Sequence, residues 1–367
     1  MISAFAPGRI NLIGEHTDYN NGFVLPAAIK QRITFSITPN QSENTGRITA
    51  NDVGETLSFD LKQLSPIPDS WSNYVLGLCD EIIKSGGKLS GFDCSFGGNI
   101  PIGAGLSSSA ALLCSAAIAL NQCFTLNKSK EEWMYLTQKA EHHFVGTKCG
   151  LMDMFASLHG KENHLMLFDC QDITFQYVPF DLKNYDLILL NTQVSHQLAS
   201  SAYNTRRREC EEVVSLVKQR KTDVSTLRDV STELLEACKI NLTEITYRRA
   251  KYVVEENKRV LKAVQYLQNG DIHSLGELLY ETHTGLKNEF EVSCQELDFL
   301  VSYTENLPEV AGARMMGGGF GGCTLNIVKK ESAEQFLTNI KAAYYREYGV
   351  ELPHYFVEPS VGATLIA

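Results

Sequence analysis

The pattern of apolar and polar positions divides the chain into two parts of different character. In the first part, short runs rich in β-branched and aromatic residues predict strands over residues 33–37, 47–50, 92–100, 164–168 and 186–190. An Ala- and Leu-rich stretch over 107–120, with serines at its start as cap candidates, and an amphipathic stretch over 130–145 predict helices. The first part is therefore predicted to be mixed α/β.

Beyond residue 193 the chain becomes richer in charge, and helices are predicted over residues 199–218, 242–267, 272–286 and 295–306. Two short strands at 311–316 and 324–328 bracket a glycine run, and a last helix is predicted over 332–347. Because 367 residues are more than one hydrophobic core usually organises, we expect two domains, residues 1–180 and 181–367.

Charge and cysteine content narrow the class of protein. With 43 acidic and 33 basic residues, the net charge of −10 argues against a nucleic-acid or anionic-membrane partner. Ten cysteines without a CxxC or zinc-type spacing predict reduced, mostly buried thiols in a cytoplasmic protein. The uncharged run 102–120 contains two glycines and four serines, so we expect a buried helix after a glycine turn rather than a membrane span.

The strongest local signal is the segment PIGAGLSSSAA at residues 101–111, where a strand meets a glycine turn and then a helix. Glycines let the backbone approach a bulky anion, and the first turn of a helix offers unpaired N–H groups. Hydroxyls there are suited to phosphate oxygens or to Mg²⁺. The segment favours a phosphate site, and the alternative is a small-residue helix packed closely on a sheet.

A dense polar cluster, GEHTDYN, follows an apolar strand near the start of the chain. Carboxylates beside an imidazole, here Glu15, His16 and Asp18, are suited to hydrogen-bonding several hydroxyls of a sugar. The alternative is a polar loop with an Asx turn. His16 and Asp18 have no third metal ligand at a useful spacing.

Two further segments carry candidate chemistry. Five glycines fall in the six positions 317–322, which favours close approach to a ligand or a neighbouring backbone, the alternative being a flexible hairpin tip. Asp153 has apolar neighbours that raise a carboxyl pKa unless a cation lies close, although a lone Asp is often a helix cap or a surface charge. Arg206, Arg207 and Arg208 are predicted to form solvated helix pairs with nearby glutamates.

These motifs together resemble the galactokinases, within the GHMP small-molecule kinase family. The resemblance covers nearly the whole chain and rests on GRINLIGEHTDYNNGFVLP (8–26), PIGAGLSSSAA (101–111), CGLMD (149–153), YNTRRREC (203–210) and GGGFGGC (317–323). It implies an α/β (α+β) two-domain GHMP kinase fold with the active site in the interdomain cleft. It also implies ATP-dependent phosphorylation of D-galactose at the C1 hydroxyl.

The resemblance further implies a role for each matching residue. Asp153 would be the general base and Arg9 the cation that keeps it ionised. The hexose would be held by Glu15, His16, Thr17, Asp18, Tyr203 and the backbone at Gly150. ATP would be bound by Trp71 and Tyr74 at the adenine and by Gly103, Ala104, Gly105, Leu106, Ser107, Ser108 and Ser109 at the phosphates. Mg²⁺ would be coordinated by Ser109 and Glu141.

Met154 and Met316 replace the Gln and Thr that are common in the family, and we expect them to affect fine substrate preference. The alternatives are a related sugar kinase acting on N-acetylgalactosamine or arabinose, and a non-catalytic sugar sensor. The complete segment from Ser107 to Ala111 favours catalysis over the sensor. We expect a monomer with small-molecule substrates and with no nucleic-acid or membrane partner.

Overall fold

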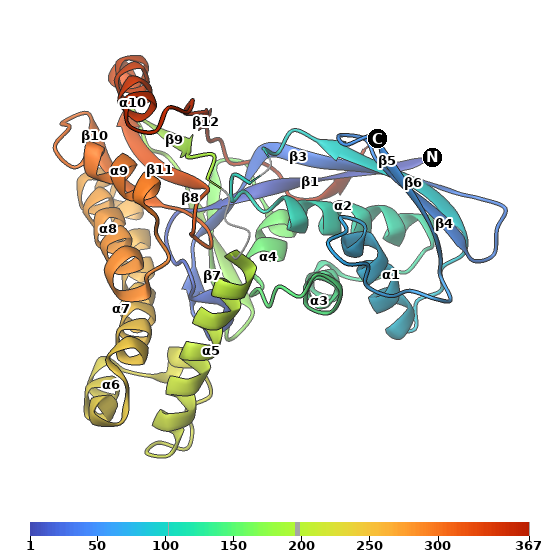
Figure 1. Ribbon diagram of the computed structural model, residues 1–367, viewed down its shortest axis with the longest axis horizontal. Coiled ribbons are helices and arrows are strands. Elements are labelled where there is room, and N and C mark those ends of the chain that lie inside the picture. Colours follow the sequence, from blue (N-terminus) through green and yellow to red (C-terminus); the bar gives the residue numbers. More distant parts are fainter. Residues whose placement is uncertain (102, 195–198, 367) are drawn as a thin grey trace.

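A six-stranded sheet forms the framework of the first half of the chain (Figure 1). The computed structural model describes residues 1–101, 103–194 and 199–366. The strand order is β13-β1-β3-β6-β4-β5, and only β4 and β6 run parallel. The strands are β1 Ile2–Asn11, β3 Pro26–Pro39, β4 Thr45–Ala50, β5 Glu55–Asp60, β6 Phe92–Gly98 and β13 Thr364–Leu365.

Helices cover one face of this sheet (Figure 1): α1 Asn73–Lys84, α2 Ser108–Cys123, α3 Lys130–Ala140 and α4 Met152–His159. The central helix α2 packs on β1 and β3 through small buried residues such as Ala110, Ala111 and Ala117. Its apolar residues lie all around the helix because the sheet is on one side and other helices are on the other. This close packing brings the glycine turn before α2 next to β1.

The second half is built on an antiparallel four-stranded sheet with the order β10-β11-β9-β12. Its strands are β9 Tyr185–Asn191, β10 Val310–Met315, β11 Cys323–Lys329 and β12 His354–Phe356. Helices α9 Gln295–Thr304 and α10 Ala333–Tyr348 pack with Ile188 and Leu190 on one face, and α8 Ile272–Gly285 packs with Leu187 and Leu189 on the other. Successive strand residues point to opposite faces, so the apolar run of β9 serves both layers.

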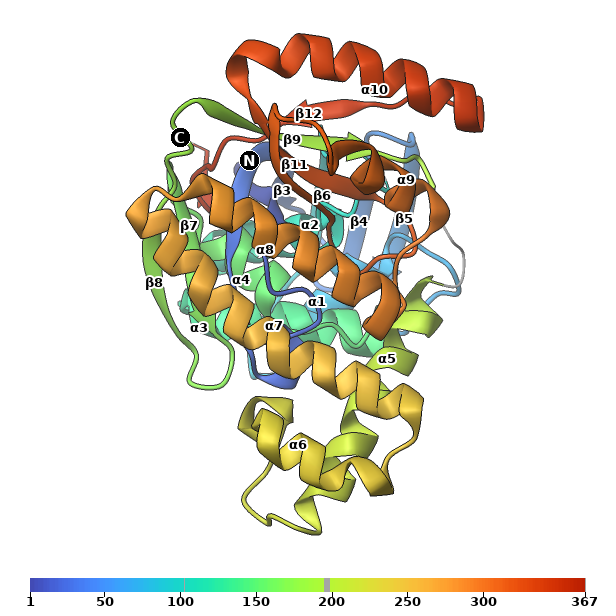
Figure 2. The same ribbon diagram turned by 90° about the vertical axis from the view of Figure 1, so that its left-hand side faces the viewer.

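Helices α7 Glu244–Asn269, α5 Ala199–Lys218 and α6 Thr232–Cys238 extend the second half below its sheet (Figure 2). A small sheet of β2 Phe23–Val24, β7 His164–Asp169 and β8 Thr174–Pro179 belongs to the first half, and α7 contacts both β2 and β8. The chain finally crosses back, because β13 pairs with β1 and Pro359 bridges to Ile29. Residues 359–366 therefore lie with the first half, although they follow the second half in sequence. The domain boundary at residue 180 stays a prediction.

The predicted strands and helices are present, with shifted ends, but three expectations were incomplete or wrong. Helices α1, α4 and α6 were not predicted. The helix predicted over 130–145 is an α-helix only to Ala140 and continues as a π-helical segment, Glu141–Val145. Ser107 precedes α2 in a left-handed conformation, φ +56°, and makes no capping hydrogen bond with its side chain. Ile102, the second residue of the predicted glycine-turn segment, lies outside the described residues.

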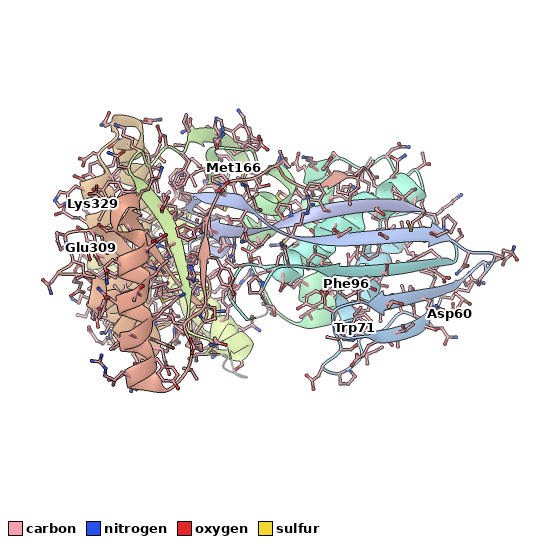
Figure 3. All side chains as sticks on the ribbon, turned by 90° about the horizontal axis from the view of Figure 1, so that it is seen from above. Asp60, Trp71, Phe96, Met166, Glu309 and Lys329 are labelled. Atoms are coloured by element: carbon pink, nitrogen blue, oxygen red, sulfur yellow. The ribbon has the colours of Figure 1, made fainter. Side chains whose placement is uncertain are left out.

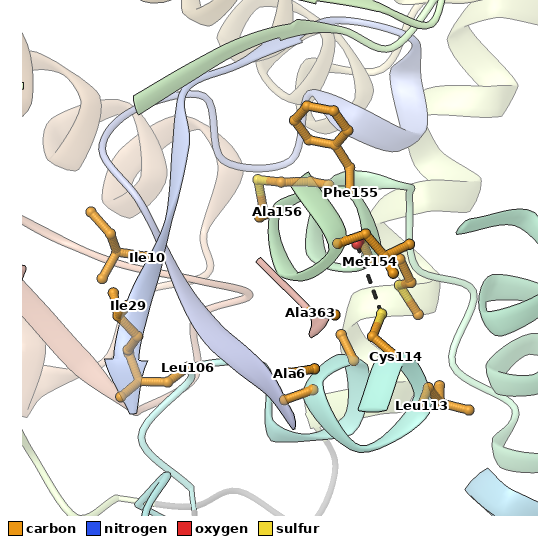
Figure 4. Packing of buried hydrophobic residues seen from close by; sticks show 14 of the residues in the cluster. Ala6, Ile10, Ile29, Leu106, Leu113, Cys114, Met154, Phe155, Ala156 and Ala363 are labelled. Carbon is orange, nitrogen blue, oxygen red and sulfur yellow. Dashed lines mark hydrogen bonds between the residues drawn. The ribbon is translucent and has the colours of Figure 1, made fainter. Parts of the chain in front are cut away.

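Both methionines that depart from the family pattern lie in the core. Figure 4 shows Met154 on α4 among buried side chains, with the Cys114 thiol directed at its carbonyl oxygen, 3.8 Å away. Met316 is 1% exposed. All ten cysteines have free thiols, and eight of them are buried, as predicted. Among the described residues no helix is long and apolar enough to cross a membrane.

Candidate active site

A polar cavity of about 110 Å³ lies between the two halves of the chain. The 12–20 loop after β1, the start of α4, helix α5 and the glycine run all contribute to its wall. Its lining residues are Arg9, Glu15, His16, Asp18, Glu141, Thr147, Cys149, Met152, Asp153, Tyr203, Gly317 and Gly318. Most side chains predicted to act on a sugar therefore converge here from segments far apart in the sequence.

Arg9 on β1 and Asp153 in the first turn of α4 form an ion pair, with 2.7 Å between Nε and Oδ1. Burial alone would lower the pKa of Arg9, but the charge of Asp153 and its hydrogen bond outweigh burial, and the pKa is raised. Ser107 donates its hydroxyl to the second carboxylate oxygen, Oδ2, at 2.6 Å. The Ser107 side chain thus contacts the carboxylate of Asp153 instead of capping α2.

Glu15 and His16 are held rigidly at the wall of the polar cavity. Glu15 Oε1 accepts hydrogen bonds from the backbone N–H of Gly317, at 2.8 Å, and from Arg314, at 3.0 Å. Nδ1 of His16 lies 2.8 Å from the Tyr19 hydroxyl, and burial lowers the pKa of His16 to about 3. The imidazole is therefore neutral at pH 7. Its buried Nε2 has no hydrogen-bond partner among the residues that the structure describes, which suits it to a ligand hydroxyl.

Asp18 explains why a glycine stands at position 150. Burial, with the charge of Asp153, raises the pKa of Asp18 to about 7. The Asp18 carboxylate lies so close to the backbone of Gly150 that a Cβ there would overlap it.

Thr17, by contrast, is fully buried, and its hydroxyl lies 2.8 Å from the carbonyl oxygen of Gly14 and 2.6 Å from that of Phe23. Thr17 fastens the 12–20 loop and does not line the polar cavity.

Tyr203 on α5 completes the cavity wall, with its ring centroid 5.4 Å from that of His16. One turn later Arg206 donates to the carbonyl oxygens of Phe290, at 2.7 Å, and Glu291, at 2.9 Å. Arg206 does pair with Glu209, at 3.2 Å, but the pair is largely buried and not solvated as predicted, and Arg206 also fixes the π-helical segment Leu286–Phe290. Arg207 and Arg208 do pair with glutamates four residues on, Glu211 and Glu212.

An aromatic cavity of about 220 Å³ lies beside the start of α2. Its wall contains Ile33, Ala50, Asp52, Val53, Trp71, Tyr74, Phe96, Gly98, Ile100, Ser108, Ser109 and Leu112. Trp71 lies beside Phe96 (Figure 3), with ring centroids 5.6 Å apart, and donates its indole N–H to Glu55 at 2.6 Å. The two aromatic residues predicted at the adenine therefore lie with two of the three predicted phosphate serines.

The glycine turn separates this aromatic cavity from Arg9. Gly103 and Gly105 have φ of +73° and +72°, a conformation that glycine adopts without strain. The carbonyl oxygen of Gly105 accepts a hydrogen bond from Arg9 Nη1 at 2.7 Å. Ala104 and Leu106 have buried side chains, so only their backbone groups are available to a ligand.

Ser109 and Glu141 connect the two cavities. Ser109 lines the aromatic cavity and Glu141 the polar one, yet Ser109 Oγ and Glu141 Oε1 are only 3.4 Å apart. Glu141 begins the π-helical segment after α3, a rare distortion that is frequent at functional sites. Burial and the charge of Asp153 raise the pKa of Glu141 to about 8. In the described part of the chain no basic side chain forms an ion pair with it.

Comparisons with known proteins agree with this arrangement. Residues 2–39 match the galactokinase galactose-binding signature, and residues 73–161 and 263–346 match the N-terminal and C-terminal GHMP kinase domains. The galactokinase of Thermotoga neapolitana is 38% identical, with 98% of this chain and 99% of that protein covered. The chain belongs to the galactokinase family of GHMP kinases. The resemblance found in the sequence is thereby confirmed.

Further relatives support the same family. The galactokinase of Clostridium acetobutylicum is also 38% identical, over 99% of this chain and 94% of that protein. The crystal structure of Lactococcus lactis galactokinase complexed with galactose superposes with a TM-score of 0.94 at 33% identity, covering 99% of this chain and 94% of that one. The two-domain GHMP kinase fold is confirmed. A GHMP kinase is ATP-dependent, so the expected use of ATP holds as well.

Some residues of this galactokinase-family site were missed in the sequence. Arg314 contacts Glu15, and Thr147 and Met152 line the polar cavity. The position of Arg314, a single charge within the apolar strand β10, was a signal that could have found it. Met152 belongs to the CGLMD segment, but no role was predicted for it, and Thr147 lies in a segment with no distinguishing pattern. The glycine run, in contrast, makes the predicted close approach, because Gly317 binds Glu15 and Gly318 lines the cavity.

Proposed function

We propose that this chain transfers the γ-phosphoryl group of ATP to the C1 hydroxyl of D-galactose, giving galactose 1-phosphate and ADP. The observation that carries the proposal is the Arg9–Asp153 ion pair, which lies in the polar cavity beside the glycine turn. The match of residues 2–39 to a galactose-binding signature supports the choice of sugar.

Asp153 acts as the general base in this proposal. One carboxylate oxygen accepts from Arg9 and the other from Ser107, and each oxygen keeps a lone pair for a further hydrogen bond. Asp153 accepts the C1 proton while the hydroxyl oxygen bonds to the γ-phosphorus and the bond to the bridging oxygen of ADP breaks. Arg9 places a positive charge 2.7 Å from Asp153 Oδ1 and stabilises the negative charge that develops during transfer.

The hexose hydroxyls are held by Glu15, His16, Asp18 and Tyr203, with the backbone of Gly150 behind Asp18. Glu15, His16 and Asp18 are buried, so a substrate hydroxyl replaces the water that each polar atom would otherwise need. Thr17 contributes indirectly, because its hydroxyl stabilises the 12–20 loop that carries these groups. The phosphates are bound by residues 103–109 at the start of α2, and adenine lies between Trp71 and Tyr74 in the aromatic cavity.

We propose Ser109 and Glu141 as the protein ligands of Mg²⁺. Two oxygens 3.4 Å apart, one from a buried carboxylate whose pKa is raised by burial, fit a divalent cation. No group of three or more His, Cys, Asp or Glu side chains suited to a metal occurs in the described part of the chain, and Mg²⁺ usually keeps few protein ligands beside phosphates and water. When bound, the ion would neutralise charge on the triphosphate.

The Mg²⁺ assignment has its own test. Ser109→Ala and Glu141→Gln should each raise the Mg²⁺ concentration needed for half-maximal rate by about tenfold, because each removes one of few protein oxygens. Ser108→Ala, which leaves both oxygens in place, is the matched control in the same magnesium titration. Unchanged titrations in both variants would remove this pair from the metal site.

The activity itself is tested by measuring ADP release from ATP with purified protein over a panel of D-galactose, N-acetylgalactosamine, L-arabinose and D-glucose. We expect D-galactose to have the highest kcat/KM by at least about tenfold, since a buried polar site rejects an ill-fitting sugar strongly. Faster turnover of N-acetylgalactosamine or arabinose would indicate a related sugar kinase. Galactose binding without turnover would indicate a sensor.

Two properties complete the proposal. We propose a monomer, which is supported by the completion of both cavities within one chain. We also propose a cytoplasmic location, which is supported by ten free thiols, most of them buried.

A further inference from the structure

We propose that Arg314 and Glu256, two buried side chains of opposite charge from the second half, are positioning residues that fix the 12–20 loop and thereby set the affinity for galactose. This inference rests on the proposed function of the polar cavity. Neither side chain lines that cavity, so both act through the loop.

Arg314 contacts the 12–20 loop from β10. Its side chain is fully buried, and it donates from Nε to the carbonyl oxygen of Leu12 at 2.8 Å and from Nη2 to Glu15 Oε1 at 3.0 Å. Further guanidinium hydrogen bonds reach the carbonyl oxygens of Asn11 and Met315. The planar guanidinium therefore hydrogen-bonds to the backbone and to a side chain of the loop at the same time, which a lysine cannot do in the same geometry.

Glu256 contacts the same loop from α7. Its carboxylate is fully buried, and Oε1 accepts the backbone N–H of Gly14 at 2.9 Å. Oε2 accepts from Arg259, at 2.6 Å, and from Thr282, at 3.0 Å, so the carboxylate itself is held firmly. Gly14 has φ +102°, which makes this residue the turning point of the loop.

The two side chains bind neighbouring residues of one short segment. Arg314 donates hydrogen bonds to the carbonyl oxygen of Leu12 and the carboxylate of Glu15, and Glu256 accepts one from the N–H of Gly14, which lies between them in sequence. A buried charge is expensive to keep unless its partners are well placed, so two such side chains aimed at three loop groups indicate a role beyond packing. Binding groups are effective only when held within about 0.5 Å of the productive geometry.

The reacting groups are held in place by contacts that do not involve Arg314 or Glu256. Arg9 lies on β1 and Asp153 on α4, and they contact each other and the glycine turn. Loosening the 12–20 loop should therefore weaken galactose binding more than it slows phosphoryl transfer. Trp71, Tyr74 and the start of α2 do not contact Arg314 or Glu256 among the described interactions, so ATP binding should be preserved.

The experiment compares Arg314→Lys and Glu256→Gln with Glu255→Gln in steady-state kinetics at varied galactose and ATP. Glu255 is the neighbour of Glu256 on α7 and, within the described residues, hydrogen-bonds to Lys258 and Thr232 but not to the loop, which makes it the matched control. We expect the first two variants to raise KM for galactose by roughly tenfold. Arg314→Lys loses hydrogen bonds to the loop, and the single amide oxygen of Glu256→Gln can accept from Gly14 or from Arg259 and Thr282 but not from both. KM for ATP and kcat should stay within about threefold, and Glu255→Gln should match the wild type.

Several results would overturn the inference. Arg314→Lys and Glu256→Gln with a lowered melting temperature but an unchanged KM for galactose would show a structural role alone. Equal increases in KM for galactose and ATP, or a fall in kcat alone, would also contradict it. Should Arg314→Lys not fold, Glu256→Gln decides the matter with the same measurements.

A double variant gives an independent check. Because Arg314 acts partly through Glu15, Glu15→Gln with Arg314→Lys should raise KM by less than the product of the two single effects, and a full product would contradict the inference. The wild type measured in parallel separates this failure from failure of the proposed function. A wild type that neither binds galactose in calorimetry nor phosphorylates it overturns both proposals, whereas an active wild type with unaffected variants overturns only this one.

Discussion

The polar cavity and the aromatic cavity lie side by side but differ in the kind of residue that lines them and in the part of the chain that supplies it. The polar cavity is lined by polar groups from both halves, among them the buried side chains of Arg9, Glu15 and Asp18 and the half-buried side chain of Tyr203. The aromatic cavity is about twice as large, and its lining residues all come from positions 33–112 of the first half. Trp71 and Phe96 give it a broad apolar surface.

This difference follows from what each subsite must recognise. Hydroxyl groups are distinguished by hydrogen bonds of fixed direction, and a desolvated partner left unpaired is costly. A purine ring presents a flat apolar face, so stacking surface does most of the binding and tolerates small displacements. Substitutions in the polar cavity should therefore have large and specific effects, and those in the aromatic cavity small ones.

The largest expected effect is on the chemical step. Asp153→Asn keeps the shape of the side chain but removes its basicity and its charge beside Arg9. We expect kcat to fall by roughly 10²–10⁴, the usual contribution of positioned proton transfer, while galactose affinity changes far less. Single-turnover measurement at saturating galactose and ATP is needed, because slow product release would otherwise hide the loss.

Asp52→Asn is the control for this substitution, since Asp52 lines the aromatic cavity and has no contact with Arg9 among the described interactions. Retention of kcat within about tenfold by Asp153→Asn would contradict a base mechanism. Asp153 would then orient the sugar while phosphoryl transfer outruns deprotonation.

The next effect is on sugar binding. Asp18→Ala should raise KM for galactose by roughly 10- to 100-fold, as expected for one or two charged hydrogen bonds, while KM for ATP stays nearly constant. Removing the carboxylate also opens space against Gly150, so Asp18→Asn, which keeps the volume, serves as the control for packing. Unchanged galactose kinetics in both variants would return Asp18 to the status of a turn residue.

The sequence predicted local features of these cavities well and distant contacts poorly. The glycine turn and the helix α2 follow from composition and period over a dozen residues. The contacts of Arg314 and Gly317 with Glu15 join positions 299 and 302 residues apart, and no local pattern encodes such pairs. Ser107 was a candidate helix cap from residue type alone, but its hydroxyl donates a hydrogen bond to Asp153 instead.

Short length explains the missed helix α4. It has only 8 residues, fewer than the roughly 11–18 over which an amphipathic pattern is recognised, and its first turn holds Asp153. The π-helical segments Glu141–Val145 and Leu286–Phe290 arise from packing at helix ends, and propensity does not distinguish them from α-helix. Roles for Asp153, Arg9 and Glu141 therefore came from the family resemblance and not from pattern.

A smaller, pH-dependent effect separates the two cavities further. The pKa of Asp18 is raised by burial to about 7, so the free protein loses the ionised carboxylate as pH falls through 7. Galactose hydroxyls bond more strongly to the ionised form, so KM for galactose should rise by about fivefold from pH 7 to pH 6 and level off above pH 8. Asp18→Asn should lose this dependence. An equal rise in KM for ATP would contradict the assignment to Asp18.

The smallest effect concerns the edge of the aromatic cavity. The Trp71 indole N–H donates to the exposed carboxylate of Glu55 at 2.6 Å, and this bond fixes the plane of the ring beside Phe96. Because stacking depends on the ring more than on its hydrogen bond, Glu55→Ala should raise KM for ATP by only about two- to threefold, with KM for galactose unchanged. Glu55→Gln retains an acceptor oxygen and should behave like the wild type. A change larger than about tenfold in Glu55→Ala would mean that the aromatic cavity is as tightly specified as the polar one, and the contrast between the two cavities would not hold.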